Sequence, residues 1–121
     1  MPGRSGSNPW GSFSSTIGDK AFLNGTLTLT APGTVAYTLG DSTMGTVTVS
    51  NGSVSTSNDT VSFSLAYTPG TNPNKGAAGT YNFSGSWINH AGGPNANAGY
   101  DGSCNLQDEV GGDDDWTAPT N

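Results

Sequence analysis

The side chains that most often act as nucleophiles or general bases are scarce in this chain. His90 is the only histidine and Cys104 the only cysteine. A nucleophile activated by a histidine base could therefore be a Cys104–His90 pair. A surface histidine and an unreactive thiol explain the same two residues. Paired carboxylates for glycoside hydrolysis would have to lie on rigid elements, and no Asp or Glu falls inside a strand predicted below. We therefore expect no enzymatic activity.

The acidic residues are the best candidates for a binding site, because six of the nine lie after position 100. Oxygen-bearing side chains alternate from Asp101 to Glu109, as the ligands of a calcium loop do. An EF-hand would need glycine and glutamate at positions that here hold Leu106 and Gly112. No cofactor is expected unless Ca²⁺ binds here, and the alternative is an acidic tail in solvent. The candidate calcium ligands are Asp101, Asp113, Asp114 and Asp115.

Two of the three tryptophans lie in segments that are otherwise rich in Gly, Ser and Asp. Trp10 lies near the N-terminus and Trp116 near the C-terminus, and a Trp side chain that docks buries about 150–250 Å². Such residues either clamp the protein's own sheet or insert into a neighbouring subunit. The candidate partner-binding residues are Trp10, Phe13 and Trp116.

Threonines alternate in two of the predicted strands, at positions 26, 28, 30, 46 and 48. A flat threonine array could bind ice or a glycan, although threonine also favours strands for other reasons. For a glycan, aromatic and amide side chains around the loop 69–79 form a candidate site. Its members are Tyr81, Trp87 and Asn74.

Alternation of apolar and polar residues identifies the elements that must position these side chains. In the stretches 60–68 and 80–88 the apolar residues occupy every second position, except at Gly85, which leaves a gap on the apolar side. A period of two predicts strands with one buried face. The same pattern predicts strands over about 22–30 and 34–39, and we expect further short strands between 46 and 57.

Three turns between these strands predict a single register. A three-residue loop at 31–33 sets Leu29 opposite Val35. An Asn-Gly pair at 51–52 favours a type I′ hairpin, and a turn at 58–59 continues the same pairing. Because all three keep the apolar residues on one face, they support one another.

Length and composition complete the expected fold. The 121 residues suit one domain, and the hydrophobic fraction of 31% predicts a thin core. We expect an all-β protein, an antiparallel meander of about six strands that forms a small sandwich or barrel. The β domain would span 21–90, between an extended Gly/Ser-rich arm at 1–20 and an acidic Gly/Asn/Asp-rich tail at 91–121.

The function expected from this design is a non-enzymatic structural subunit. Three basic residues cannot form a nucleic-acid surface, and no apolar run has the length of a signal peptide or membrane span. We expect a virion protein, such as a phage capsid decoration or appendage, whose arms contact copies of itself or other structural subunits. The alternatives are an extracellular carbohydrate-binding module or lectin, with or without calcium, and an ice-binding sheet.

Overall fold

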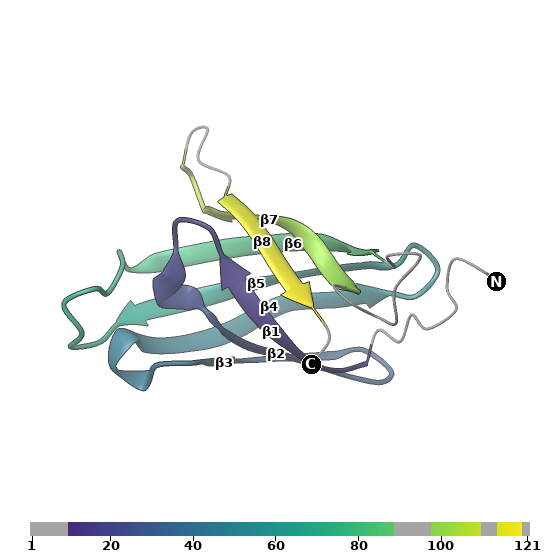
Figure 1. Ribbon diagram of the computed structural model, residues 1–121, viewed down its shortest axis with the longest axis horizontal. Helices are drawn as coiled ribbons and strands as arrows, with labels where there is room; N and C mark the ends of the chain where they lie inside the picture. Colours follow the sequence, from purple (N-terminus) through teal and green to yellow (C-terminus); the bar gives the residue numbers. More distant parts are fainter. Residues whose placement is uncertain (1–9, 89–97, 110–113, 120–121) are drawn as a thin grey trace.

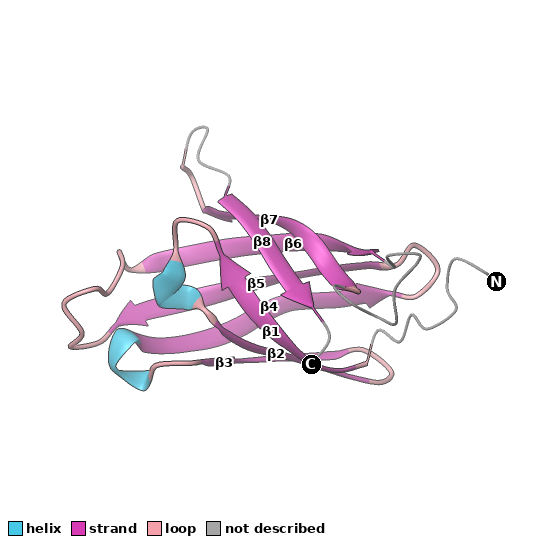
Figure 2. Cartoon of the chain, in the orientation of Figure 1, coloured by secondary structure: helices cyan, strands magenta, loops and turns pink. Residues whose placement is uncertain are grey.

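The computed structural model describes residues 10–88, 98–109 and 114–119, which form eight β-strands, two short 3₁₀ helices and no α-helix (Figures 1 and 2). The predicted all-β antiparallel class is confirmed, with eight strands in place of about six. In chain order the elements are β1 (Gly11–Ile17), η2 (Ala21–Leu23), β2 (Gly25–Thr30), β3 (Thr34–Leu39), η3 (Ser42–Met44), β4 (Gly45–Ser55), β5 (Thr60–Pro69), β6 (Gly79–Ile88), β7 (Gly99–Leu106) and β8 (Asp114–Pro119).

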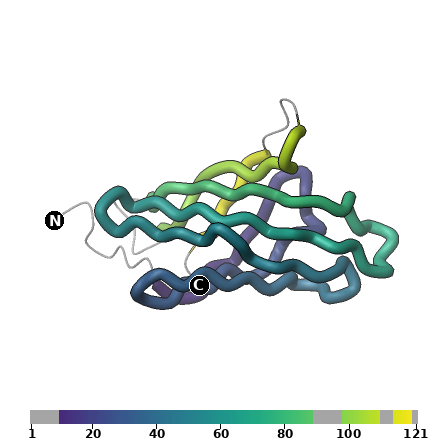
Figure 3. Tube along the Cα trace, turned by 180° about the vertical axis from the view of Figure 1, so that it is seen from behind, coloured from purple at the N-terminus to yellow at the C-terminus, as the bar shows by residue number. Residues whose placement is uncertain are grey.

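The strands form one sheet in the order β3-β2-β1-β8-β7-β6-β5-β4. Its two end strands, β3 and β4, follow each other in the chain and are in contact, so the sheet curls into a nearly closed barrel (Figure 3). β1 connects the first strands of the chain to the last one, because its residues Gly11–Ser15 pair with β2 while Thr16 and Ile17 pair with β8.

The predicted register of the first hairpin, between β2 and β3, is confirmed. The register of β5 with β6 agrees with the alternation of apolar residues in those two strands. Leu29 lies opposite Val35 across the loop at 31–33, and Phe63 of β5 lies opposite Phe83 of β6. Apolar and polar residues alternate along most of these strands, so a slip by one residue would turn their inward apolar side chains to solvent.

The Asn-Gly pair at 51–52 is not a hairpin turn, and that prediction is wrong. β4 continues through it and pairs with β5 on both sides, with Ser50 opposite Ser64 and Ser53 opposite Ser62. The pair forms a bulge in which the asparagine adopts a φ of 54°. β5 is long enough to pair with the residues on both sides of the bulge, so no chain reversal is needed.

The predicted turn at 58–59 is also displaced. Ser55 lies opposite Thr60, so the loop spans the four residues 56–59.

The predicted arm at 1–20 and tail at 91–121 are wrong wherever the structure describes them as strands. β1 lies inside the first segment, while β7 and β8 lie inside the second, so the sheet extends well beyond the predicted 21–90. Inward positions on these strands hold small or polar residues such as Ser15 and Ala118. Their alternation is therefore too weak to identify by apolar contrast.

β1 and β8 pass over β5 and β6 (Figure 1), and aromatic side chains of these strands pack together in the core. The rings of Phe63 and Phe83 stack with centroids 4.7 Å apart, and Trp116 meets them edge-on at 5.8 and 5.6 Å. The Trp116 ring fills the gap predicted at Gly85, since a Cβ added there would lie 2.4 Å from it. Its indole N–H donates to Ser15 Oγ at 2.6 Å. Trp116 thus fastens β8 to both walls of the barrel.

Candidate functional site

Lys20 is held at one end of the barrel, between β1 and η2. The Gly18 N–H donates to the Asp115 carbonyl at 2.9 Å and so extends the pairing of β1 with β8. The Lys20 carbonyl accepts from the Leu23 N–H at 2.9 Å where η2 forms. Backbone hydrogen bonds on both sides therefore fix Lys20 beside the start of β8.

Asp114 begins β8 and lies on its inward face. Side chains alternate along a strand, so Asp114 shares its face with Trp116 and Ala118, which are both fully buried. Cys104 of β7, also fully buried, is its cross-strand partner. A carboxylate at this position has to meet a cation, because burying an unpaired charge is costly.

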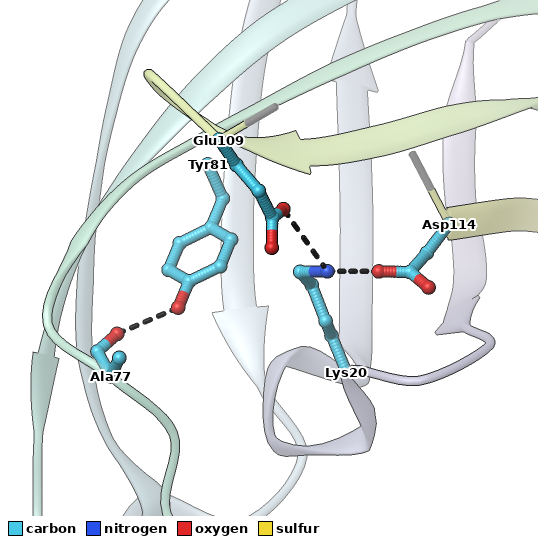
Figure 4. A network of polar contacts seen from close by, with 5 residues as sticks. All are labelled: Lys20, Ala77, Tyr81, Glu109 and Asp114. Atoms are coloured by element: carbon cyan, nitrogen blue, oxygen red, sulfur yellow. Dashed lines mark hydrogen bonds and ion pairs between the residues drawn. The ribbon is translucent and has the colours of Figure 1, made fainter. Parts of the chain in front are cut away.

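Lys20 provides that cation, and Glu109 brings a second carboxylate (Figure 4). Lys20 Nζ donates a hydrogen bond to Asp114 Oδ2 and lies 3.8 Å from Glu109 Oε1. The side chains of Lys20 and Asp114 are 12% and 11% exposed, and that of Glu109 is 36% exposed. Tyr81 lies alongside, and its hydroxyl donates to the Ala77 carbonyl at 2.7 Å. We call Lys20, Asp114 and Glu109 the Lys20 cluster.

The electrostatics of the Lys20 cluster follow from burial and from the two carboxylates. Burial lowers the pKa of the Lys20 ammonium, but the hydrogen bond to Asp114 and the charges of Asp114 and Glu109 outweigh it, so the pKa is raised. Burial raises the pKa of the Tyr81 hydroxyl, while the nearby Lys20 charge opposes that shift. At neutral pH the site therefore holds a cation, carboxyl groups and a neutral phenol. Its available chemistry is proton exchange between an amine and carboxyl groups.

The predicted partner-binding residues do not form one exposed surface. Phe13 and Trp116 are 1% and 0% exposed, so they fasten the protein's own sheet and are unavailable to a neighbouring subunit. Trp10 is half-buried and packs against the same core. For Phe13 and Trp116 the prediction is therefore wrong, because β1 and β8 are strands of the barrel.

The predicted sugar-binding residues also fail to converge. Tyr81 is 2% exposed and points into the barrel, and Trp87 is half-buried against Phe13 and Tyr100. Asn74 is exposed in the loop between β5 and β6. A depression on the outside of β5, β6 and β7 is lined by small and polar residues, four of them serines, and its lining includes no aromatic ring among the described residues. No aromatic platform for a sugar is therefore formed there.

The predicted calcium ligands are separated by the strand geometry. Asp101 is exposed on β7 and Asp115 on the outward face of β8, while Asp114 points inward to Lys20. Asp113 lies outside the described residues. In the described parts of the chain, no three His, Cys, Asp or Glu side chains gather as metal ligands would. The alternation that suggested a calcium loop is that of a strand, which spreads its side chains over two faces.

The threonines proposed as an ice-binding array lie on two strands that are not paired. Positions 26, 28 and 30 belong to β2, and positions 46 and 48 to β4, which the order of the sheet separates. The two candidate nucleophilic residues do not form a described pair either, since Cys104 is buried and His90 lies outside the described residues.

Sequence reasoning missed the Lys20 cluster. Lys20 was one of three basic residues with no assigned role, and Asp114 was grouped with its acidic neighbours as a metal ligand. One signal was available, since Asp114, Trp116 and Ala118 share a parity. That spacing predicts an inward carboxylate once the segment is taken as a strand.

Comparison of the chain with protein-family models, with curated proteins and with solved structures finds no match. Across 10–88, 98–109 and 114–119, no helix has the length and apolar character needed to cross a membrane. Any function has to be argued from the surface and the site.

Proposed function

We propose that this chain is a non-enzymatic structural subunit that assembles with copies of itself, as a virion decoration or appendage protein does. The attribution to a virion rests on analogy of design, since a small β body poor in charge suits a repeated building block. Before position 100 the sequence carries only three acidic and three basic residues. Charge repulsion between copies is weak when a surface carries so few charges, so such copies can pack closely.

The observation that carries the proposal is the break in the sheet between β3 and β4. Each of these strands is paired on one side only in the described part of the chain, with β2 and with β5 respectively. Unpaired edges offer backbone donors and acceptors to another chain. Half-buried apolar side chains lie along the break, namely Val35, Leu39, Val47 and Val49.

A groove with a volume of about 220 Å³ lies at the η3 end of this break. Its lining includes Tyr37, Leu39, Val47 and Gly45. A sheet edge with apolar side chains beside it suits the addition of a strand from a second copy. This contact takes the place of the arm contacts expected from the sequence, because the described parts of those arms belong to the barrel.

The test is the mass and shape of the purified protein in solution. We expect native mass spectrometry and negative-stain microscopy to find rings, filaments or lattices. A charged residue on the edge, Thr48→Lys, should weaken assembly, whereas the control Ser84→Lys on the internal strand β6 should not. Both positions are exposed, so neither change should unfold the barrel.

A monomer at every concentration up to the solubility limit would overturn the proposal. Glycan-array binding that is lost on addition of EDTA would favour the carbohydrate-binding alternative instead.

A further inference from the structure

The Lys20 cluster is an unusual way to close a small barrel. Removing an ammonium and a carboxylate from water is costly, and a well-packed apolar pair often does as well or better. Here the pair lies at a core-facing position of β8, with Glu109 Oε1 at 3.8 Å from the same nitrogen. An ion pair between Lys20 and Asp114 does not require this second carboxylate, whereas a reaction between amine and carboxyl can use it for proton transfer.

We propose that Lys20 and Asp114 condense into an intramolecular isopeptide bond, with Glu109 as the proton-transfer group. The proposal does not depend on the proposed assembly, because the three groups belong to one chain. It assigns a covalent self-modification to the Lys20 cluster.

The reaction is a condensation that releases one water molecule and changes no oxidation state. Glu109 first relays a proton from the Lys20 ammonium to the Asp114 carboxylate, which leaves a neutral amine beside a neutral carboxylic acid. The Nζ lone pair then attacks Cγ of Asp114, and the new N–C bond forms. The C–OH bond breaks, and the hydroxyl leaves as water with a second proton from Nζ, which Glu109 carries across. Glu109 ends in its initial protonation state.

The position of the reacting groups favours this step. Lys20 Nζ and Asp114 Oδ2 are in direct contact, and groups held in this way react as if at very high concentration. Tyr81 and Cys104, which lie around the pair, are 2% and 0% exposed. Burial by itself disfavours the charged ammonium, although the neighbouring carboxylates outweigh it, and limited access of water slows the hydrolysis that would reverse the reaction.

The bond would also have a clear structural effect. It joins the segment after β1 to the start of β8, between residues 94 positions apart in the sequence. Cross-linking distant residues restricts the unfolded chain, as a disulfide does. With a single cysteine in the chain, no disulfide within one molecule can provide that restriction.

The experiment is intact-mass measurement of the purified full chain, followed by peptide mapping. We expect the mass to be lower than that of the sequence by one water, with a branched peptide that contains both Lys20 and Asp114. The Asp101-Gly102 pair could lose water by forming a succinimide, so the branched peptide and not the mass alone is decisive. Lys20→Arg should restore the full mass, whereas Lys75→Arg, which changes an exposed lysine, should not.

Glu109→Gln tests the role of the second carboxylate, and because the Glu109 side chain is partly exposed, we expect the variant to fold. We expect this variant to keep the β-sheet circular dichroism spectrum and to form the bond at least tenfold more slowly, since general acid–base catalysis typically contributes about 10²–10⁴-fold. Bond formation at the unaltered rate would overturn the role of Glu109. Wild-type protein that keeps the full mass after prolonged incubation, without a branched peptide, would overturn the isopeptide bond itself, whether or not the variants fold.

Discussion

Two carboxylates of this protein, Asp114 and Asp41, each link distant parts of the chain, but they do so in opposite surroundings. Asp114 lies on the inward face of β8 and meets Lys20 where both side chains are about nine-tenths buried. Asp41 lies before η3, fully open to solvent, and accepts from the N–H and Oγ1 of Thr43 at 2.9 and 2.6 Å. The Asn72 side-chain amide also donates to Asp41, with its nitrogen 3.3 Å from Oδ2.

The difference shows what burial does to a charged group. Hydrogen bonds from the Thr43 side chain and backbone lower the pKa of Asp41, and water can replace them at little cost. Around Lys20, water has little access, so each charged partner depends on the others. The exposed carboxylate is therefore an ordinary helix cap, and the buried one is a site where a reaction is favoured. Four predictions test this comparison.

The largest effect is expected from Asp114→Ala. This change leaves Glu109 as the remaining carboxylate near the Lys20 ammonium and removes the group that would form the isopeptide bond; the loss of the buried pair alone costs about 3–5 kcal/mol. Urea unfolding followed by tryptophan fluorescence measures the loss. The matched controls are Asp41→Ala and Asp115→Ala, which remove exposed carboxylates. Equal stability of all three variants would contradict the distinction between the two environments.

The second prediction separates the packing of β8 from its charge. Gly85→Ala places a Cβ 2.4 Å from the Trp116 ring, and overpacking of this kind costs about 1–3 kcal/mol. Gly33→Ala is the control, because a Cβ there meets nothing within 4 Å. If thermal unfolding gives the same midpoint for both variants, Trp116 does not hold β8 as described.

The third prediction concerns alkaline pH. The pKa of Lys20 is raised above its ordinary value of 10.5, so the ion pair contributes its full stability below that pH and loses it as the pH rises through the folded-state pKa. An amide has no such proton, so the linked wild type should lose less stability above pH 10.5 than Glu109→Gln does. Lys75→Gln controls for general deprotonation of lysine. A steeper alkaline loss in wild type than in Glu109→Gln would contradict the account.

The smallest effect is expected from Asp41→Asn. Because the pKa of Asp41 is lowered from its ordinary 3.8, its stabilisation is present above that value and is lost as the pH falls through the folded-state pKa. The asparagine variant lacks this acid-dependent component, so its thermal midpoint should fall slightly less between neutral pH and pH 2. A large difference in thermal midpoint between wild type and Asp41→Asn at neutral pH would contradict the small contribution expected of a solvent-exposed carboxylate.

The central strands could be predicted from the sequence because their inward positions hold large apolar residues. The pairing of Leu29 with Val35 determined one register, and Gly85, which has no side chain, indicated a gap on the apolar face of β6. The partner that fills this place, Trp116, lies far away in the sequence and was assigned to a tail. Alternation identifies a buried face, but it does not identify what covers that face.

The terminal strands and the Lys20 cluster were missed for a single physical reason. Ser15 takes an inward position because it accepts the Trp116 indole N–H, and Asp114 takes one because Lys20 reaches it. Each polar residue is satisfied by a partner more than 90 positions away. Polar residues in such places resemble those of a solvated segment, and only the three-dimensional pairing distinguishes the two.

A crystal structure of the full chain tests the central claim most directly, through the separation of Lys20 Nζ and Asp114 Cγ. The isopeptide bond predicts continuous electron density and a separation of about 1.33 Å, the length of an amide C–N bond. An ion pair instead predicts a complete carboxylate with both oxygens, and an oxygen about 2.7–2.9 Å from Nζ. Intact density for both carboxylate oxygens, in protein aged before crystallisation, would contradict the account.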